Sequence, residues 1–168
     1  TGSDTACSNT YVLFTASTRH TANLGGLAGA DAICQARADA AQLSGTYIAI
    51  LSVTGTNARD RITTNTNYPI RLVNGTKVGD NWADLFDGSI HAAPNVNENG
   101  QFITSNPVVF TASNVDGTAD FRDCEDFTTT ANDGGSPRGG STDATDGGWL
   151  LTYASLCSSS NRLYCIGR

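Results

Sequence analysis

The chain has 168 residues, of which 39% are hydrophobic and 15% are charged, and its formal net charge is −6 at pH 7. Its length suits one domain over residues 1–168, with residues 1–9 as an N-terminal linker. Because phosphate backbones are bound by clustered Lys and Arg, the negative net charge argues against nucleic acid as a partner. No apolar run reaches the roughly 20 residues that span a bilayer, so no membrane insertion is expected.

The first half of the chain alternates between strand-like and helix-like patterns. Residues Thr10–Ala16 form an apolar run rich in β-formers and predict a first strand. From Leu27 to Leu43 apolar residues recur every three or four positions, which predicts an amphipathic helix that stops at Gly45. This helix carries Cys34 on its buried face. The segment Thr46–Ser52 then predicts a core strand.

Shorter elements follow. Asn57–Ile62 predicts a helical turn, and Tyr68–Val73 predicts an extended segment. The spacing within Asp80–Asp87 predicts a two-turn helix that ends at Gly88. Its apolar face consists of Trp82, Leu85 and Phe86, so we expect Trp82 in the core.

The last third contains a long polar stretch between strand-like segments. Val108–Ala112 predicts a strand, and Trp149–Tyr153 and Arg162–Ile166 predict two closing strands, with Trp149 in the core. Between them, Ser113–Gly148 is dominated by Gly, Asp, Thr and Ser and predicts a loop without elements of its own. Loops of this length in compact domains are usually functional or disordered.

The cysteines indicate an oxidising compartment. Four of the five are spread along a chain rich in Gly, Thr and Asn, which fits two structural disulfides and an extracellular protein. Three pairings of these four are open, and the remaining Cys7 lies near the N-terminus. None of the cysteines forms a C-x-x-C pair, so a structural zinc site is not expected.

The order of these elements, together with the amino-acid sequence of several segments, resembles that of domains in the C-type-lectin-like superfamily. The similarity is greatest to its endostatin-like branch, the C-terminal domain type of collagen XVIII, and to bacterial extracellular domains of that type. The segments that carry the resemblance are Gly25–Cys34, Leu43–Tyr47, Ala49–Ser52, Tyr68–Ile70, Trp82–Ser89 and Leu163–Ile166.

The resemblance implies an α+β, C-type-lectin-like fold, with a mixed, mainly antiparallel sheet, two helices and a long polar loop. It also implies nested disulfides, Cys34–Cys165 and Cys124–Cys157, which leave Cys7 over. The basic residues for heparin and the N-terminal histidines for zinc of endostatin have no counterpart here. The calcium-binding tripeptides of sugar-binding C-type lectins are absent from the sequence as well.

The chain has two histidines, His20 and His91, as candidates for a catalytic base. Neither lies in a nucleophile elbow or a metalloprotease helix motif, so we interpret both as surface histidines and the chain as a binding protein rather than an enzyme. Asn95–Gly100 resembles half of a calcium loop, but neutral amides bind calcium poorly, and an Asn-Gly turn is the preferred interpretation.

The acidic residues of the polar stretch leave two interpretations open, one of which is calcium binding. Their carboxylates could bind a calcium ion, or they could cap turns and keep the segment soluble. They are Asp116, Asp120, Asp123, Glu125, Asp126, Asp133, Asp143 and Asp146. No cofactor and no metal ligand is assigned from the sequence.

The sequence therefore predicts an extracellular recognition or adhesion module. It would present the loop Ser113–Gly148 on a rigid scaffold to a glycan or to a surface or matrix protein. The predicted ligand-binding residues are Asp133, Arg138, Asp143 and Asp146. The alternative is a structural cap domain without a small ligand, which forms a homo-oligomer, such as a trimer, within a larger surface or fibre protein.

Overall fold

The computed structural model describes residues 9–132 and 135–168, so Cys7 and Asp133 lie outside the described residues. The strands are β1 (Tyr11–Thr15), β2 (Tyr47–Ala49), β3 (Ile70–Leu72), β4 (Lys77–Gly79), β5 (Val108–Phe110), β6 (Arg138–Ser141), β7 (Tyr153–Ala154) and β8 (Tyr164–Gly167). The helices are α1 (Gly26–Ala40) and α2 (Cys124–Phe127), with 3-10 turns η2 (Ala58–Asp60), η3 (Ala83–Phe86) and η4 (Gly147–Trp149). None of the helices in the described ranges is long and apolar enough to cross a membrane.

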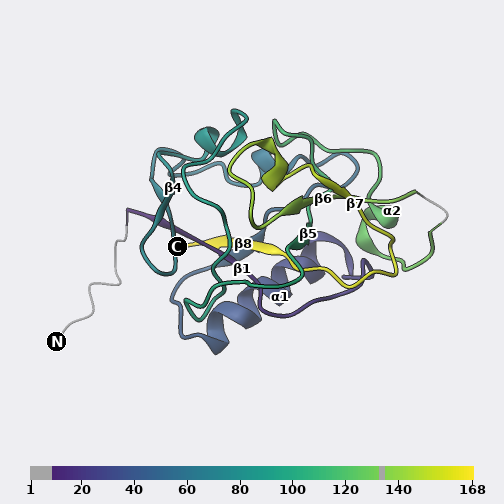
Figure 1. Cartoon of the computed structure of the whole chain (residues 1–168), viewed down its shortest axis with the longest axis horizontal. Coiled ribbons are helices and arrows are strands. Elements are labelled where there is room, and N and C mark those ends of the chain that lie inside the picture. Colours follow the sequence, from purple (N-terminus) through teal and green to yellow (C-terminus); the bar gives the residue numbers. More distant parts are fainter. Residues whose placement is uncertain (1–8, 133–134) are drawn as a thin grey trace.

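Two sheets organise the domain (Figure 1). The larger has five strands in the order β2-β8-β1-β3-β4, in which β1 and β3 are parallel and the other neighbours antiparallel. The smaller sheet is antiparallel, in the order β5-β6-β7. The prediction of an α+β domain with a mixed, mainly antiparallel sheet is therefore confirmed.

The side chains of strand β1 are buried on both sides of the larger sheet. Tyr11 and Leu13 belong to one core cluster, which also contains the fully buried Trp149. Phe14 belongs to the other, together with Cys34 of α1. Because alternate residues of a strand point to opposite faces, a strand covered on both sides reads as a continuous apolar run. This is why Thr10–Ala16 was recognisable as a strand.

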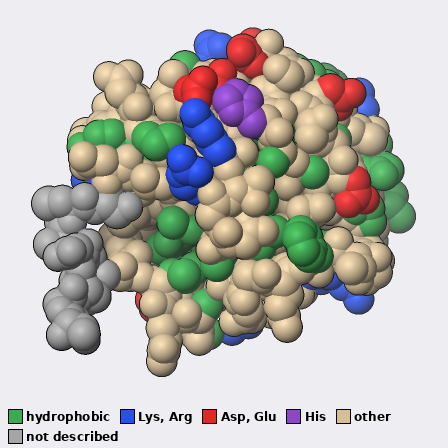
Figure 2. All heavy atoms as spheres, turned by 60° about the vertical axis from the view of Figure 1, so that its left-hand side comes forward, with side chains coloured by type: hydrophobic (Ala, Val, Ile, Leu, Met, Phe, Trp, Pro, Cys, Tyr) green, Lys and Arg blue, Asp and Glu red, His purple; other side chains and the backbone are tan. Residues whose placement is uncertain are grey.

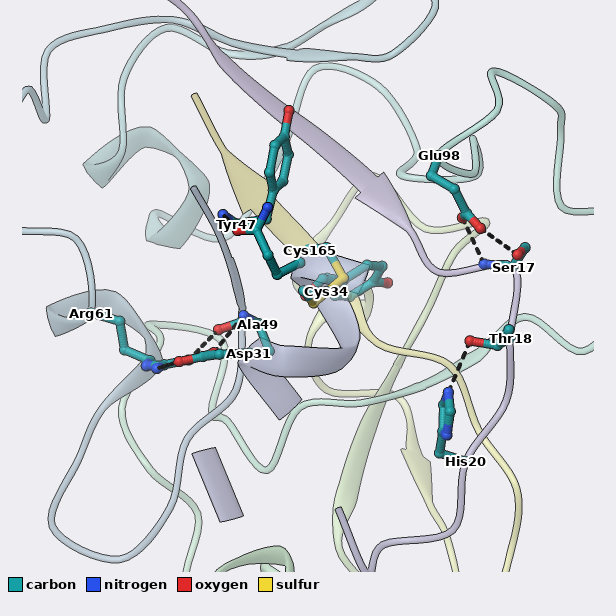
Figure 3. Close-up of a disulfide and its surroundings, with 12 residues drawn as sticks. Ser17, Thr18, His20, Asp31, Cys34, Tyr47, Ala49, Arg61, Glu98 and Cys165 are labelled. Carbon is teal, nitrogen blue, oxygen red and sulfur yellow. Dashed lines mark hydrogen bonds and ion pairs between the residues drawn. A yellow bond between two sulfur atoms is a disulfide. The ribbon is translucent and has the colours of Figure 1, made fainter. Parts of the chain in front are cut away.

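Helix α1 packs on the sheet through small side chains. Its buried positions are Ala30, Cys34 and Ala38, four residues apart and therefore on one face. The carboxylate of Asp31 accepts hydrogen bonds from the backbone N–H of Ala49 and from Arg61, at N···O distances of 2.6–2.9 Å. Figure 3 shows this cluster beside the disulfide that joins α1 to β8. The helix is thus held to β2 by polar as well as apolar contacts.

The disulfides pair Cys34 with Cys165 and Cys124 with Cys157, as the resemblance implies. The outer bridge spans 131 residues of sequence and the inner bridge 33. The outer one joins α1 to the last strand, and the inner one joins α2 to the segment that follows β7. Each bridge therefore connects elements that are distant in the sequence.

Two predicted elements are shorter than expected. Asp80–Asp87 forms only the 3-10 turn η3, because the carboxylate of Asp84 and the amide of Asn81 accept backbone N–H groups nearby, at 2.7 and 3.0 Å. The predicted strand Trp149–Tyr153 begins instead as η4, which Asp146 caps by accepting the N–H of Gly148 at 2.9 Å. The core positions of Trp82 and Trp149 are confirmed, at 4% and 0% exposure.

The prediction that Ser113–Gly148 is a loop without elements of its own is wrong. It contains α2 and β6, and β6 is the central strand of the smaller sheet. A Cβ atom at Gly139 would lie 2.5 Å from the carbonyl oxygen of Val109, and one at Gly140 would lie 1.7 Å from that of Trp149. Glycine is present here because two backbones approach closely, not because the chain is irregular.

Candidate functional site

The clearest candidate site surrounds the side chain of Phe86 at the end of η3. The Phe86 ring contacts the ring of Trp82, with centroids 4.9 Å apart, and lies 6.2 Å from that of Trp149. Trp82 is itself fixed by its indole N–H, which donates to the carbonyl of Arg59 at 2.6 Å. Phe86 is only partly buried, so one part of the ring packs on the core and another remains accessible.

The turn at residues 113–119 closes against this ring. Gly117 has a φ of +77°, and a Cβ atom at this position would lie 2.4 Å from Cδ1 of Phe86. The backbone N–H of Asn114 donates to the carbonyl of Thr118 at 2.8 Å, and Arg59 N–H donates to Gly117 at 3.2 Å. A glycine at this turn is therefore required both by its conformation and by its contact with Phe86.

Asp116 lies at the tip of this turn as an ionised acceptor. The hydroxyl of Thr118 donates to its Oδ1 at 2.6 Å and the backbone N–H of Thr118 at 3.0 Å. The hydroxyl bond, followed by the backbone bond, holds the pKa of Asp116 below its usual value, and Arg59 contributes to the shift. Arg59 also lies 3.6 Å from Asp116 Oδ2. The carboxylate is thus charged and fixed in direction.

Two open hollows adjoin at Phe86 and Asp116. The larger has a volume of about 450 Å³ and the smaller about 260 Å³. The larger is lined by Phe86, Asp87, Gly88, Asn114, Val115, Asp116, Thr118 and Leu151. The smaller is lined by Arg59, Asp60, Trp82, Ala83, Phe86 and Asp116. Together they form a shallow surface that segments 59–60, 82–88 and 114–118 share.

The lining combines one aromatic face with acceptor groups. Phe86, Val115 and Leu151 supply apolar contact, while three carboxylates outnumber the single guanidinium of Arg59. Pockets that bind small ligands commonly join apolar contact to a few directed polar groups. This surface therefore suits a ligand that has an apolar face and hydrogen-bond donors, such as hydroxyl or ammonium groups.

The predicted ligand-binding residues lie apart from one another. Arg138 begins β6 with its Nε 3.8 Å from Asp120, and the exposed Asp143 lies two residues beyond the other end of that strand. Asp146 caps η4 and pairs with Ser89, next to the larger hollow. The structure therefore does not bring Arg138 and Asp143 together, and none of the three lines the hollows. The fourth residue, Asp133, lies outside the described residues.

The acidic residues of the polar stretch accept hydrogen bonds from other groups of the chain. Asp120 binds Arg122 at 2.9 and 3.0 Å, and Asp123 and Asp126 both accept the N–H of Thr54 at 2.9 Å. In the described part of the chain they do not gather as a group of metal ligands. Asn95–Gly100 forms the expected turn, in which the Asn97 amide oxygen accepts the N–H groups of residues 99 and 101.

His20 lies in the hydrogen-bonded segment that follows β1. Its Nε2 lies 2.8 Å from the hydroxyl of Thr18, whereas Ser17 donates its backbone N–H to the buried Glu98 at 2.9 Å. Burial, followed by the positive charge of Arg37, lowers the pKa of His20. Figure 3 shows Ser17 directed at Glu98 and Thr18 at His20. The Ser17–Glu98 bond ties the segment after β1 to the turn Asn95–Gly100, whereas the Thr18–His20 contact is local.

Sequence reasoning missed Phe86 and Arg59 as surface residues. Phe86 was assigned to the apolar face of a helix, where its spacing does place most of the ring. Within the polar stretch, the signal that could have located the site is Asn114–Thr118, whose Asp116-Gly117 pair is typical of a tight turn. Its proximity to Phe86 is not readable from the sequence.

Comparison with known proteins does not identify the chain. No protein-family model matches it, and no curated protein matches it. The resemblance to C-type-lectin-like domains therefore rests on the segments quoted above.

Proposed function

We propose that this chain is an extracellular recognition domain that binds its ligand on the two hollows beside Phe86. The observation that carries the proposal is that the partly exposed ring of Phe86 and the hydrogen-bonded carboxylate of Asp116 line the same two hollows. The two disulfides fit an oxidising, extracellular compartment. The domain binds rather than catalyses, and its fold is of the C-type-lectin-like type, which the nested disulfides support.

The ligand class follows from the charge of the lining. Asp60, Asp87 and Asp116 are acceptors, so the bound group presents hydroxyl or ammonium donors together with an apolar face. A glycan or a protein segment with a Lys side chain meets these requirements. An anionic ligand would face three carboxylates and only one guanidinium, which disfavours it.

The proposal can be tested by immobilising the domain and screening it against glycans and extracellular matrix proteins. The double variant Asp87→Asn/Asp116→Asn keeps the side-chain shapes but removes both charges. We expect it to weaken binding of any ligand found by about tenfold or more, as for loss of charge-assisted hydrogen bonds. Phe86→Leu keeps an apolar side chain but removes the aromatic face, and should weaken binding as well.

The matched control is Asp143→Asn, which alters an exposed carboxylate outside the hollows. It should leave binding unchanged. Binding that is lost in Asp143→Asn and kept in the double variant would contradict the site and would favour the segment after β6 instead.

The alternative function, an oligomerising cap domain, is favoured by a different observation. Phe121 is 82% exposed and Leu156 is 52% exposed, and the edge strand β7 is exposed along both its residues. Exposed apolar side chains and an unpaired strand edge can each contact a second chain. Sedimentation analysis of the isolated domain distinguishes the two functions, since a stable oligomer that dissociates in Phe121→Ser would support the cap.

A further inference from the structure

Three potential metal ligands gather on the face around β4, away from the disulfides. Asp80 directly follows β4, Asp84 lies on η3, and His91 lies in the segment after the buried Ile90. One ligand atom from each of the three lies within 4.8 Å of the other two. Figure 2, which brings the β4 side of Figure 1 forward, shows a histidine beside acidic and basic side chains. Within the described ranges, this is the group that combines an imidazole with carboxylates at such spacing.

The backbone fixes two of these ligands. The N–H of His91 donates to the carbonyl of Val78 at 2.8 Å, which holds the histidine against β4. Asp84 Oδ2 accepts the N–H of Asp80 at 2.7 Å. A Cβ atom at Gly79 would lie 3.3 Å from Asp84 Oδ2 and 2.8 Å from Cδ2 of Leu85, so glycine is what lets η3 lie this close to β4. The carboxylate is therefore placed beside the histidine by the fold.

The distance between these two ligands matches a coordinated ion. Nε2 of His91 lies 3.3 Å from Oδ2 of Asp84. Zinc binds nitrogen and oxygen at about 2.0–2.1 Å, which places two ligands of a tetrahedral ion about 3.3 Å apart. The separation of Nε2 and Oδ2 in this direct ion pair is therefore compatible with both atoms binding one zinc ion.

The third ligand, Asp80, is held by Lys77. The ammonium group of Lys77 contacts Asp80 Oδ1, and both side chains are largely exposed, at 41% and 56%. Such side chains can rotate, so Asp80 can turn from Lys77 toward the ion. The ammonium also competes with the ion, because its positive charge occupies the same carboxylate.

We propose that Asp80, Asp84 and His91 bind a divalent transition-metal ion, with zinc as the best fit. Imidazole favours zinc and its first-row neighbours over calcium and magnesium, which take oxygen ligands. Three protein ligands leave a fourth position for water or for a group of a bound molecule. The site is independent of the proposed recognition surface, although η3 supplies residues to both.

The test is calorimetric titration of the metal-free domain with ZnCl2, and with CaCl2 for comparison, in a Cys7→Ser background, so that no cysteine outside the two disulfides contributes to binding. We expect one zinc ion per chain, with an affinity that falls about tenfold or more in His91→Ala and in Asp84→Asn. Zinc should also raise the unfolding temperature of the parent but not of His91→Ala, because an ion that binds only the folded state stabilises it.

The matched controls are His20→Ala and Lys77→Gln. His20→Ala removes the other histidine of the chain and should leave zinc affinity unchanged, whereas Lys77→Gln should increase it by removing the competing ammonium. The proposal is overturned if zinc does not saturate below millimolar concentration, if His91→Ala binds zinc like the parent, or if calcium binds there in preference to zinc. Circular dichroism verifies that each variant is folded.

Discussion

The region around the outer disulfide and the segment 113–148 are stabilised by different means. In the first, β1, β8 and α1 bury apolar side chains at regular spacing on both faces of one sheet. In the second, the buried residues include Asp120, whose carboxylate accepts hydrogen bonds from Arg122 within the segment, and Asp123, whose carboxylate accepts the N–H of Thr54 from another segment. A polar, Gly-rich stretch can therefore be ordered by close backbone packing and directed hydrogen bonds.

The largest expected effect comes from the disulfides, which brace the two regions separately. Chain entropy predicts a cost of about 5 kcal/mol for Cys34→Ala/Cys165→Ala and about 4 kcal/mol for Cys124→Ala/Cys157→Ala, because the closed loops differ in length. Urea unfolding of both double variants measures the difference. An inner bridge that costs more than the outer one would show that segment 113–148 contributes more stability than its loop length indicates.

The next effect concerns Phe127, the apolar anchor of the polar segment. Its ring is fully buried and lies 5.6 Å from that of Phe110. Phe127→Ala should cost about 3–5 kcal/mol through lost burial and the cavity left behind. Phe121→Ala is the matched control in the same segment, since this ring is 82% exposed and should cost less than about 1 kcal/mol. Equal costs in thermal unfolding would refute the assignment of Phe127 as the anchor.

A smaller and pH-dependent effect is expected at Asp120. The hydrogen bond from Arg122 lowers its pKa, so the folded state favours the ionised carboxyl. Its contribution is present above the unfolded pKa of about 3.9 and is lost as the pH falls through the folded pKa. Asp120→Asn should therefore destabilise by about 1–3 kcal/mol at pH 7, and the difference should shrink below about pH 4.

Unfolding of both proteins between pH 2 and pH 8 measures this effect, with exposed Asp143→Asn as the control. A difference between parent and Asp120→Asn that stays constant with pH would show that the charge of Asp120 does not stabilise the segment.

The smallest expected effect on stability comes from glycine substitutions in the two helices, whose backbone conformations differ. All four residues of α2 have positive φ values between 52° and 60°, which is a left-handed turn. Glycine relieves such strain, so Glu125→Gly at an exposed position should stabilise the domain by up to about 1 kcal/mol. Ala36→Gly, exposed in the right-handed α1, should instead destabilise by about 1 kcal/mol. Thermal unfolding that shows the same sign for both would contradict the left-handed turn.

Much of the fold was predictable because its regular elements carry local signals. The apolar run at Thr10–Ala16 and the repeat within Leu27–Leu43 each identified an element to within a few residues, since side-chain direction repeats with a fixed period. The glycines of β6, by contrast, indicated a loop where the structure has a strand. Gly139 and Gly140 are usually read as loop residues, and only their contacts with Val109 and Trp149 show a strand.

The candidate site was less predictable than the fold. Phe86 and Asp116 are far apart in the sequence, and neither follows a motif that would link them. The predicted set Asp133, Arg138, Asp143 and Asp146 was chosen by polarity within one segment, and polarity does not show which side chains meet. The same holds for Asp84 and His91, which lie on different elements and meet only through β4.

The sequence by itself determined the periodic elements, the burial of both tryptophans, the acidic charge and the cysteines available for two bridges. The tertiary structure decided that a Gly-rich segment is a central strand, that the turn at Gly117 closes on Phe86, and that Asp80, Asp84 and His91 face one another. The physical reason is the distance along the sequence between the residues that interact. Local sequence sets the direction of each side chain within its element, but close approaches between distant backbones depend on how all the elements pack together.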